Sequence, residues 1–422
     1  MEYEYAQALP PKPPRSDERM RHQADMTAVS RPRARQGWPL LAAGFRPFFL
    51  LGSIYAGLAI LVWLPVFHGE ITLISAFTPR DWHVHELLYG YLPAVITGFL
   101  FTAIPNWTGR LPIQGTPLLA LVIVWIAGRL AVTLSAETGW TTAMLVDASF
   151  LALVATAAAR EIVAGRNWKN LNVVILVLLL LAGNVAFHLE AHFRGLADTG
   201  IRIGIAVVVL LISLIGGRII PSFTRNWLAR ENPGRLPAPF ARFDMVVVAI
   251  TALTLASWIV NSGSRLTGTA LALAGLLHLV RLARWAGDRT FRERLLLVLH
   301  VGYAFVPFGF LLNAASAFGL VPPGAGIHAW MAGAAGTMTL AVMSRATLGH
   351  TGQPLTASRA TQAIYLAIIV AALARICAVI DPAHSEPLLH LAAFAWAAAF
   401  LGFAVTFGPL LAGADRRRKA VA

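Results

Sequence analysis

Charged residues and cysteine are both scarce in this chain. Only 13% of the 422 residues are charged, about half the share found in an average soluble domain. The single cysteine, Cys377, lies within an apolar run, which excludes a disulfide framework and a cysteine-ligated zinc or iron–sulfur site. Hydrophobic residues make up 57% of the chain. This balance is typical of a membrane bundle, whose outer face is covered by lipid, and not of a soluble enzyme.

Long apolar runs fill the chain from Trp38 to Gly413. A bilayer core of ~30 Å requires a helix of ~20 residues, and twelve segments meet or approach this length. The predicted fold is therefore an all-α polytopic bundle with twelve transmembrane helices. The predicted spans are 39–66, 84–105, 116–134, 141–160, 171–190, 203–220, 243–262, 266–283, 295–316, 327–345, 362–380 and 388–412.

Basic residues lie almost entirely outside these spans and mostly on one side. Of the 34 lysines and arginines, 27 fall in the two ends and in every second loop, and only four fall in the other loops. The positive-inside rule therefore predicts that both termini are cytoplasmic. The net charge of +14 does not indicate nucleic acid binding, because it is distributed among these loops. The sequence therefore predicts three parts of the chain: a disordered cytoplasmic arm rich in Pro and Arg (1–37), the membrane domain (38–413) and a basic cytoplasmic tail (414–422).

Two opposite charges occur at similar depth in neighbouring spans. Arg129 lies in the outer third of the third span, and Asp147 lies in the fourth. Ionisable groups inside a membrane face the bundle interior and pair with one another, or they mark a proton path. We expect an ion pair between Arg129 and Asp147, with a proton path as the alternative.

Histidines gather near the outer ends of several spans. His83 and His85 are two residues apart, so on a helix they point in different directions. His188 and His192 are four apart and share a helix face. His328 begins the tenth span. Imidazole is a common ligand of haem iron and of copper, although histidines at an interface also bond loop carbonyls.

Two further histidines lie toward the cytoplasmic side. His278 and His300 flank a short basic loop between the eighth and ninth spans, which are therefore expected to be antiparallel neighbours. Their depths differ by only ~5 Å at ~1.5 Å per residue. They are predicted to face each other and to bind a cofactor, and the alternative is a pair of core histidines.

The inner ends of the second, sixth and tenth spans resemble one another. The first two contain Ile-Pro followed by an aromatic and a threonine, and the third ends in Gly349-His350-Thr351-Gly352. His85 precedes Thr108 by 23 residues, and His328 precedes Thr351 by 23. This spacing indicates a possible three-fold repeat of four-helix units.

The same segments resemble the NnrS family. The resemblance is carried by Trp82-His83-Val84-His85-Glu86, by Gly98 to Gly109, by Gly217 to Trp227, by His300-Val301-Gly302-Tyr303 and by His328 to Gly352. It implies a polytopic protein of the bacterial inner membrane that contains haem and copper. It also implies a role in denitrification and in resistance to nitric oxide and nitrosative stress.

Ligand assignments are predicted from residue chemistry. His85 and His328 are predicted to ligate one haem from opposite helices, because their depth and spacing match. His83, His188 and His192 are predicted to form a separate metal site, plausibly for copper, because imidazoles at i and i+4 can converge on one ion. His278 and His300 are predicted to hold a cofactor on the cytoplasmic side. No catalytic residue and no electron donor is assigned.

Three functions agree with these features. The first is a haem- and copper-containing membrane protein that limits nitric oxide damage. The second is an oxidoreductase that draws electrons from quinol. The third is a cofactor-free secondary transporter, because twelve spans with both ends inside is also a transporter plan. A Soret band in the purified protein would exclude the third.

Overall fold

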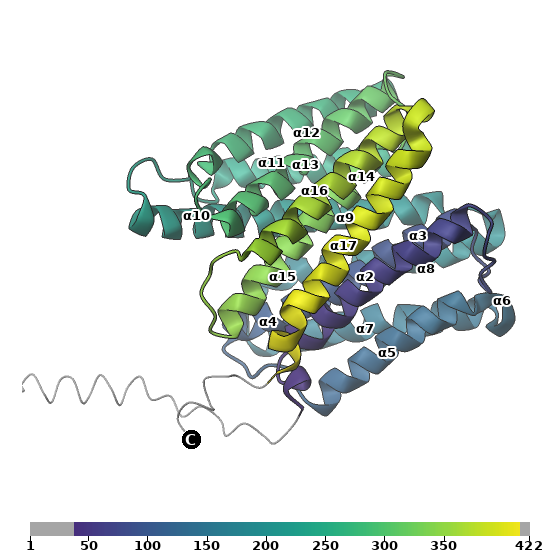
Figure 1. Cartoon of the computed structure of the whole chain (residues 1–422), viewed down its shortest axis with the longest axis horizontal. Helices are drawn as coiled ribbons and strands as arrows, with labels where there is room; N and C mark the ends of the chain where they lie inside the picture. Colours follow the sequence, from purple (N-terminus) through teal and green to yellow (C-terminus); the bar gives the residue numbers. More distant parts are fainter. Residues whose placement is uncertain (1–37, 414–422) are drawn as a thin grey trace, which may run out of the picture. The chain divides into compact units, whose positions relative to one another are not determined.

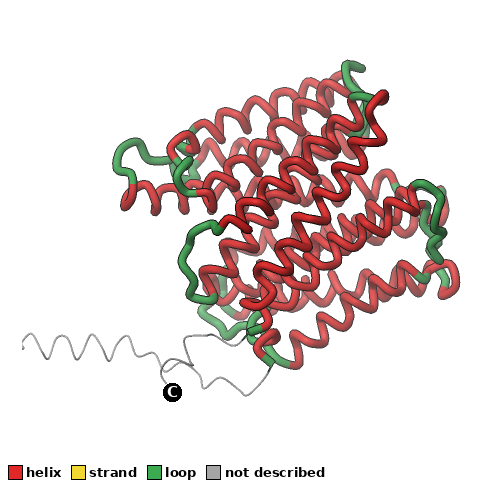
Figure 2. Tube along the Cα trace, in the orientation of Figure 1, coloured by secondary structure: helices red, strands yellow, loops and turns green. Residues whose placement is uncertain are grey.

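Helices are the only regular elements in the part of the chain that the structure describes, residues 38–413 of a computed structural model (Figure 2). This confirms the all-α prediction, whereas the predictions for the arm and the tail lie outside the described residues. Eleven helices in this range are long and apolar enough to cross a membrane. The remaining predicted span, 327–345, lies within a continuous helical segment, Ala325–His350, that is not among those eleven.

In chain order, the long helices can be divided into three consecutive groups of four. Figure 1 labels these helices. The first group contains α2 (Phe45–Phe67), a composite helix (Pro79–Thr108), α5 (Thr116–Thr133) and α7 (Trp140–Ala164). The second contains α8 (Leu171–Arg194), a composite helix (Asp198–Glu231), α11 (Arg242–Val260) and α12 (Arg265–Ala283). The third contains α13 (Arg294–Ala317), a composite helix (Ala325–His350), α16 (Arg359–Ile380) and α17 (Ser385–Ala412). Short elements between them are η1 (Pro39–Leu41), α6 (Ser135–Thr138), η3 (Trp168–Asn170), η5 (Gly287–Arg289) and η7 (Pro382–His384).

The second span of every group is a composite helix with a π-helical segment in its middle. π-Helical turns are rare and are frequent at functional sites. Their recurrence in the same span of each group agrees with the three four-helix units predicted from the sequence. The components are α3 (Pro79–His85), η2 (Glu86–Tyr91) and α4 (Leu92–Thr108); α9 (Asp198–Leu211), η4 (Ile212–Gly216) and α10 (Gly217–Glu231); and α14 (Ala325–His328), η6 (Ala329–Gly336) and α15 (Thr337–His350).

Packing joins the three groups into a closed ring around the composite helices. Helix α7 packs against α8, α12 against α13, and α17 against α2, so the last span of each group meets the first span of the next. At the closure, Nη1 of Arg46 donates hydrogen bonds to the carbonyl oxygens of Leu410 and Leu411 at 3.1 and 3.0 Å. In the centre, α9 contacts both η2 and η6, and α4 contacts α15. The composite helices therefore form the middle of the bundle.

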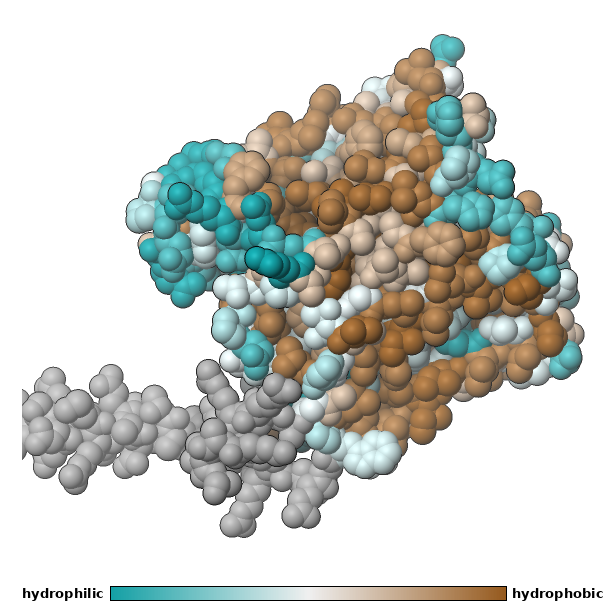
Figure 3. All heavy atoms as spheres, viewed as in Figure 1, coloured by the Kyte–Doolittle hydropathy of each residue, from teal (hydrophilic) through white to brown (hydrophobic). Residues whose placement is uncertain are grey.

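Apolar side chains cover much of the face that Figure 3 shows, and hydrophilic residues gather at the ends and loops of that face. Leu253, Val260, Leu266 and Val405 each expose 74% or more of their surface. An apolar surface of this extent is unfavourable in water and is expected for helices that face lipid. Together with the eleven apolar helices, it identifies a multi-pass membrane protein.

Two predicted span boundaries differ by six residues or more from the ends of the observed helices. The first span was predicted to start at residue 39, but Pro39–Leu41 forms a separate 3₁₀ turn and α2 begins at Phe45. The sixth span was predicted to end at residue 220, but α10 continues to Glu231. Hydropathy could not reveal this extension, because the last turns of α10 are polar and still helical.

Candidate metal centre

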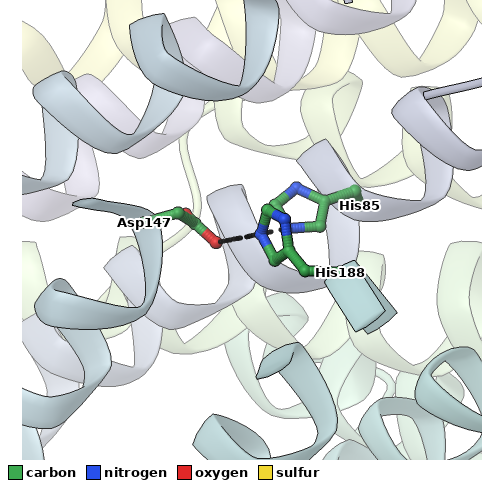
Figure 4. Close-up of side chains that lie close together, drawn as sticks. All are labelled: His85, Asp147 and His188. Atoms are coloured by element: carbon green, nitrogen blue, oxygen red, sulfur yellow. Dashed lines mark hydrogen bonds and ion pairs between the residues drawn. The ribbon is translucent and has the colours of Figure 1, made fainter. Parts of the chain in front are cut away.

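Three buried side chains from three helices converge on one point (Figure 4). His85 comes from the end of α3, Asp147 from α7 and His188 from α8. Oδ2 of Asp147 lies 3.2 Å from Nε2 of His85 and 3.2 Å from Nε2 of His188. Each residue exposes 2% of its surface or less. Two imidazoles and one carboxylate are a donor set that divalent transition metals prefer, so the cluster can hold such an ion.

The hydrogen bonds of His85 make its Nε2 available as a ligand. Nδ1 of His85 lies 3.0 Å from Oε1 of Glu86, and a carboxylate can only accept, so Nδ1 carries the proton in the neutral ring. The lone pair on Nε2 then faces Oδ2 of Asp147 and, at 3.0 Å, Oδ1 of Asn184. Three acceptors therefore point at one another. A cation among them satisfies all three. Nδ1 of His188 has no partner among the described residues.

A buried arginine links the cluster to a second carboxylate. Nη1 of Arg129 lies 2.8 and 2.9 Å from the two carboxylate oxygens of Glu86, and Nη2 bonds Asp147. This confirms the predicted ion pair between Arg129 and Asp147. The hydroxyl of Tyr55 donates to Glu86. Two carboxylates and one guanidinium leave a formal charge of −1 in a buried site, and a bound cation offsets that charge.

Two glycines allow the helices to approach closely enough for this network. A Cβ atom at Gly90, in η2, would lie 2.3 Å from Nη1 of Arg129. A Cβ atom at Gly128, in α5, would lie 3.2 Å from Cα of Asp147. The guanidinium thus rests against the backbone of the π-helical segment that directly follows His85.

A separate cavity of about 460 Å³ lies on the other side of α3. His83 and His328 line it together with Arg80 and Arg375, and most of the remaining wall is apolar. The ring of His83 stacks on Trp63 with 4.2 Å between the ring centroids. His83 and His85 therefore serve two different compartments, as their spacing on one helix predicted.

The structure does not bring together His85 and His328, which were predicted to share one haem. His85 belongs to the buried cluster, and His328 lines the cavity, where its histidine neighbour is His83. The two predicted partners have equivalent positions in their repeats. Equal depth does not fix the direction in which a side chain points, and each of the two faces a different compartment.

The predicted set of His83, His188 and His192 is also separated. His188 is in the cluster, whereas His192 is exposed and stacks on Trp140 at a centroid distance of 4.2 Å. His192 lies in the last turn of α8, one turn beyond the part that the neighbouring helices cover. His83 lines the cavity. Only His188 of this set therefore lies in the buried cluster.

His278 and His300 are engaged with different partners. Nε2 of His278 lies 2.9 Å from Oγ1 of Thr251, and its Nδ1 lies 2.9 Å from the hydroxyl of Tyr303. Nε2 of His300 lies 3.0 Å from Oγ1 of Thr224. Both nitrogens of His278 are thus occupied, as in a core histidine. His300 keeps a buried Nδ1 without a partner among the described residues.

Sequence reasoning missed three participants in the cluster. Asp147 was expected to be an ion-pair partner or part of a proton path, although a carboxylate inside a span also suits a metal. Asn184 lies one turn before His188 on α8, and its Nδ2 donates to Oδ2 of Asp147 at 2.7 Å. Glu86 follows His85 directly. The available signal was their polarity within apolar spans, because such groups occur there mainly at functional sites.

The family of the chain follows from comparison with known proteins. No curated protein matches it. The model of the NnrS protein family matches residues 39–414, which is nearly the whole chain and includes the buried cluster and the cavity. The chain therefore belongs to the NnrS family and, at the level of that family, is a membrane protein of the nitric oxide response.

Proposed function

We propose that this protein holds haem and copper in the bacterial inner membrane and limits damage by nitric oxide during denitrification. One observation carries the proposal: His83 and His85, two residues apart on α3, supply imidazoles to two different compartments. The compartment that contains His85 is polar and small, and the one that contains His83 is a mostly apolar cavity of about 460 Å³. A single metal ion suits the first, and an organic cofactor suits the second.

Copper fits the buried cluster by its donor chemistry. His85, Asp147 and His188 provide two neutral imidazoles and a carboxylate, and the surrounding network has an unbalanced negative charge. The position of Asn184 supports ligand orientation, because its amide holds the carboxylate of Asp147. A non-haem ferrous ion also accepts two histidines and one carboxylate, so metal analysis decides between copper and iron.

Haem fits the cavity lined by His83 and His328. The volume of about 460 Å³ is within the range of cofactor sites, ~300–1,000 Å³. Apolar walls suit the macrocycle, an imidazole suits its iron, and Arg375 suits a propionate, whereas Arg80 already pairs with Asp198. Within the described residues, Arg375 forms no ion pair, so its charge is available to an anionic group.

The two groups, when bound, supply a haem that binds nitric oxide and a second redox centre on the far side of α3. The two groups are kept apart because the side chains of His83 and His85 point into different compartments. The charged network, with Arg129 at the centre, holds the metal ligands in place and excludes water from them.

The experiment is purification of the full chain from bacterial membranes, followed by an absorption spectrum and metal analysis. A Soret band together with stoichiometric copper supports the proposal. Among variants, His328→Ala is expected to lose haem and keep copper, and His188→Ala is expected to lose copper and keep haem. His192→Ala is the matched control, because His192 is exposed and lies one turn from His188.

The two alternative functions give different results in the same preparation. A cofactor-free transporter shows no Soret band and no bound metal. A quinol-linked oxidoreductase shows both cofactors and also oxidises added quinol with turnover. No observed feature of the described residues favours either of them over the proposal.

A further inference from the structure

A second cavity, of about 610 Å³, lies among the C-terminal halves of the three composite helices. The cavity with His83 and His328 lies at their opposite, N-terminal ends. The wall of this second cavity comes from α4, α10 and α15, with further residues from α2, α8 and α13. Figure 3 shows this side of the molecule hollowed beneath the hydrophilic end of α10. None of the metal-centre residues lines it.

The repeat places equivalent residues around this cavity. Thr102 and Arg218 each lie three residues before the proline of the Ile-Pro motif, and Arg345 lies six residues before Thr351, as Thr102 does before Thr108. All three of these equivalent positions line the cavity. Two of the three positions are arginines, so positive charge is concentrated at this cavity.

The two arginines have no acidic partner within the described residues. The guanidinium of Arg345 lies 4.3 Å from the ring centroid of Phe223, and that of Arg218 lies 5.3 Å from that of Phe240. No aspartate or glutamate lines the cavity. Glu293, whose charge acts on Arg345, accepts a hydrogen bond from the backbone amide of Leu295. Guanidinium groups stacked on aromatic rings keep their donors free for an anion.

The rest of the wall is suited to a hydrocarbon chain. Phe49, Phe99 and Leu299 line the cavity together with the two arginines. The site thus combines apolar walls with two positive charges. A free inorganic anion has no use for the apolar part, whereas a phospholipid has both components.

We propose that this cavity binds an anionic phospholipid, with Arg218 and Arg345 on the phosphate and the apolar wall along an acyl chain. The side of the bundle agrees with this ligand, because the basic loops predict that the C-terminal ends of α4 and α15 face the cytoplasmic leaflet, which is rich in anionic lipid. The site does not depend on the bound haem or copper. It anchors the three repeats to one lipid.

Native mass spectrometry of the purified full chain tests this proposal. Phosphatidylglycerol and phosphatidylcholine are added in turn as probes, and retained lipid is counted. Phosphatidylglycerol is expected to bind the unaltered chain, and Arg218→Gln with Arg345→Gln is expected to weaken it about tenfold for each arginine lost. The control is Arg225→Gln with Arg242→Gln, because both residues are exposed, on α10 and α11, and line neither of the two cavities.

Three outcomes overturn the proposal. The first is equal retention of the two lipids by the unaltered chain. The second is equal loss of phosphatidylglycerol in the cavity variant and in the control. The third is displacement of the lipid by millimolar inorganic phosphate, which identifies the site as one for a soluble anion. A melting curve and the retained metal content show that the variants are folded, and Arg345→Lys, which keeps the charge, is expected to restore part of the binding.

Discussion

Nε2 of His85 lies 3.2 Å from Oδ2 of Asp147, and neither residue is accessible to solvent. The contact joins the second span to the fourth, and His188 brings the fifth span to the same oxygen. A buried carboxylate between two imidazole nitrogens is an arrangement that a metal ion stabilises.

Replacement of the carboxylate is expected to remove the metal. In Asp147→Asn the site loses a ligand and its excess negative charge, so metal content measured by mass spectrometry should fall at least about tenfold. Asp381→Asn is the control, because Asp381 lies in an exposed loop where it pairs with His384. Retention of metal by Asp147→Asn at the level of this control contradicts the assignment.

Asn184→Ala is expected to have a smaller effect on the same centre. Asn184 does not need to bind the ion, but its Nδ2 holds Oδ2 of Asp147 at 2.7 Å. Loss of such an orienting partner reduces metal affinity about 10- to 100-fold, which a competing chelator measures. If the affinity is unchanged, the amide has no part in positioning the carboxylate.

Removal of the buried arginine is expected to destabilise the protein strongly. Arg129→Met leaves Glu86 and Asp147 buried without their counter-charge, and such a loss costs about 3–5 kcal/mol. Arg194→Met is the matched control, since Arg194 pairs with Glu190 on the exposed end of α8 and such pairs contribute only about 0.3–0.5 kcal/mol. Denaturant unfolding in detergent compares the two, and equal changes would contradict the role of Arg129.

Gly90→Ala is expected to disturb the same network through the backbone. The added Cβ would lie 2.3 Å from Nη1 of Arg129, and this guanidinium cannot turn away without breaking its bonds to Glu86 and Asp147. Overpacking of this kind costs about 1–3 kcal/mol. In Gly263→Ala the new Cβ has no atom within 4 Å, so that variant should unfold as the unaltered chain does. Normal metal content in Gly90→Ala would show that the arginine has room to move.

A second buried ion pair is predicted to act on stability alone. Arg281 on α12 donates from Nε to Asp244 at 2.7 Å and from Nη1 to the carbonyl of Ser213 in η4. Asp244→Asn is therefore expected to lower the free energy of unfolding by about 3–5 kcal/mol. The metal content of the folded fraction should not change. A loss of metal in this variant would mean that the two networks are coupled.

Much of the fold could be predicted because hydropathy reports depth directly. Apolar runs located the spans, and similar depth in neighbouring spans correctly paired Arg129 with Asp147. The spacing of His83 and His85 also correctly predicted that they point in different directions. Each of these inferences needs only position along a helix axis or around one helix.

The ligand sets could not be predicted, because they depend on how helices are rotated about their axes. The π turn that begins at Glu86 changes this rotation directly after His85, and no pattern in the sequence announces it. His188 and His192 share a helix face, but only His188 lies where neighbouring helices cover it. Depth therefore paired His85 with His328, whereas the structure pairs His85 with His188 and places His83 near His328.

The separation of the two compartments by α3 is tested most directly by haem and copper content in two variants, His83→Ala and His85→Ala. Both are measured on the full chain purified from the same membranes, by the Soret absorbance and by metal analysis. His83→Ala is expected to lose haem and retain copper, and His85→Ala is expected to lose copper and retain haem. Loss of both cofactors in each variant, or of the same cofactor in both, would contradict the separation of the two compartments.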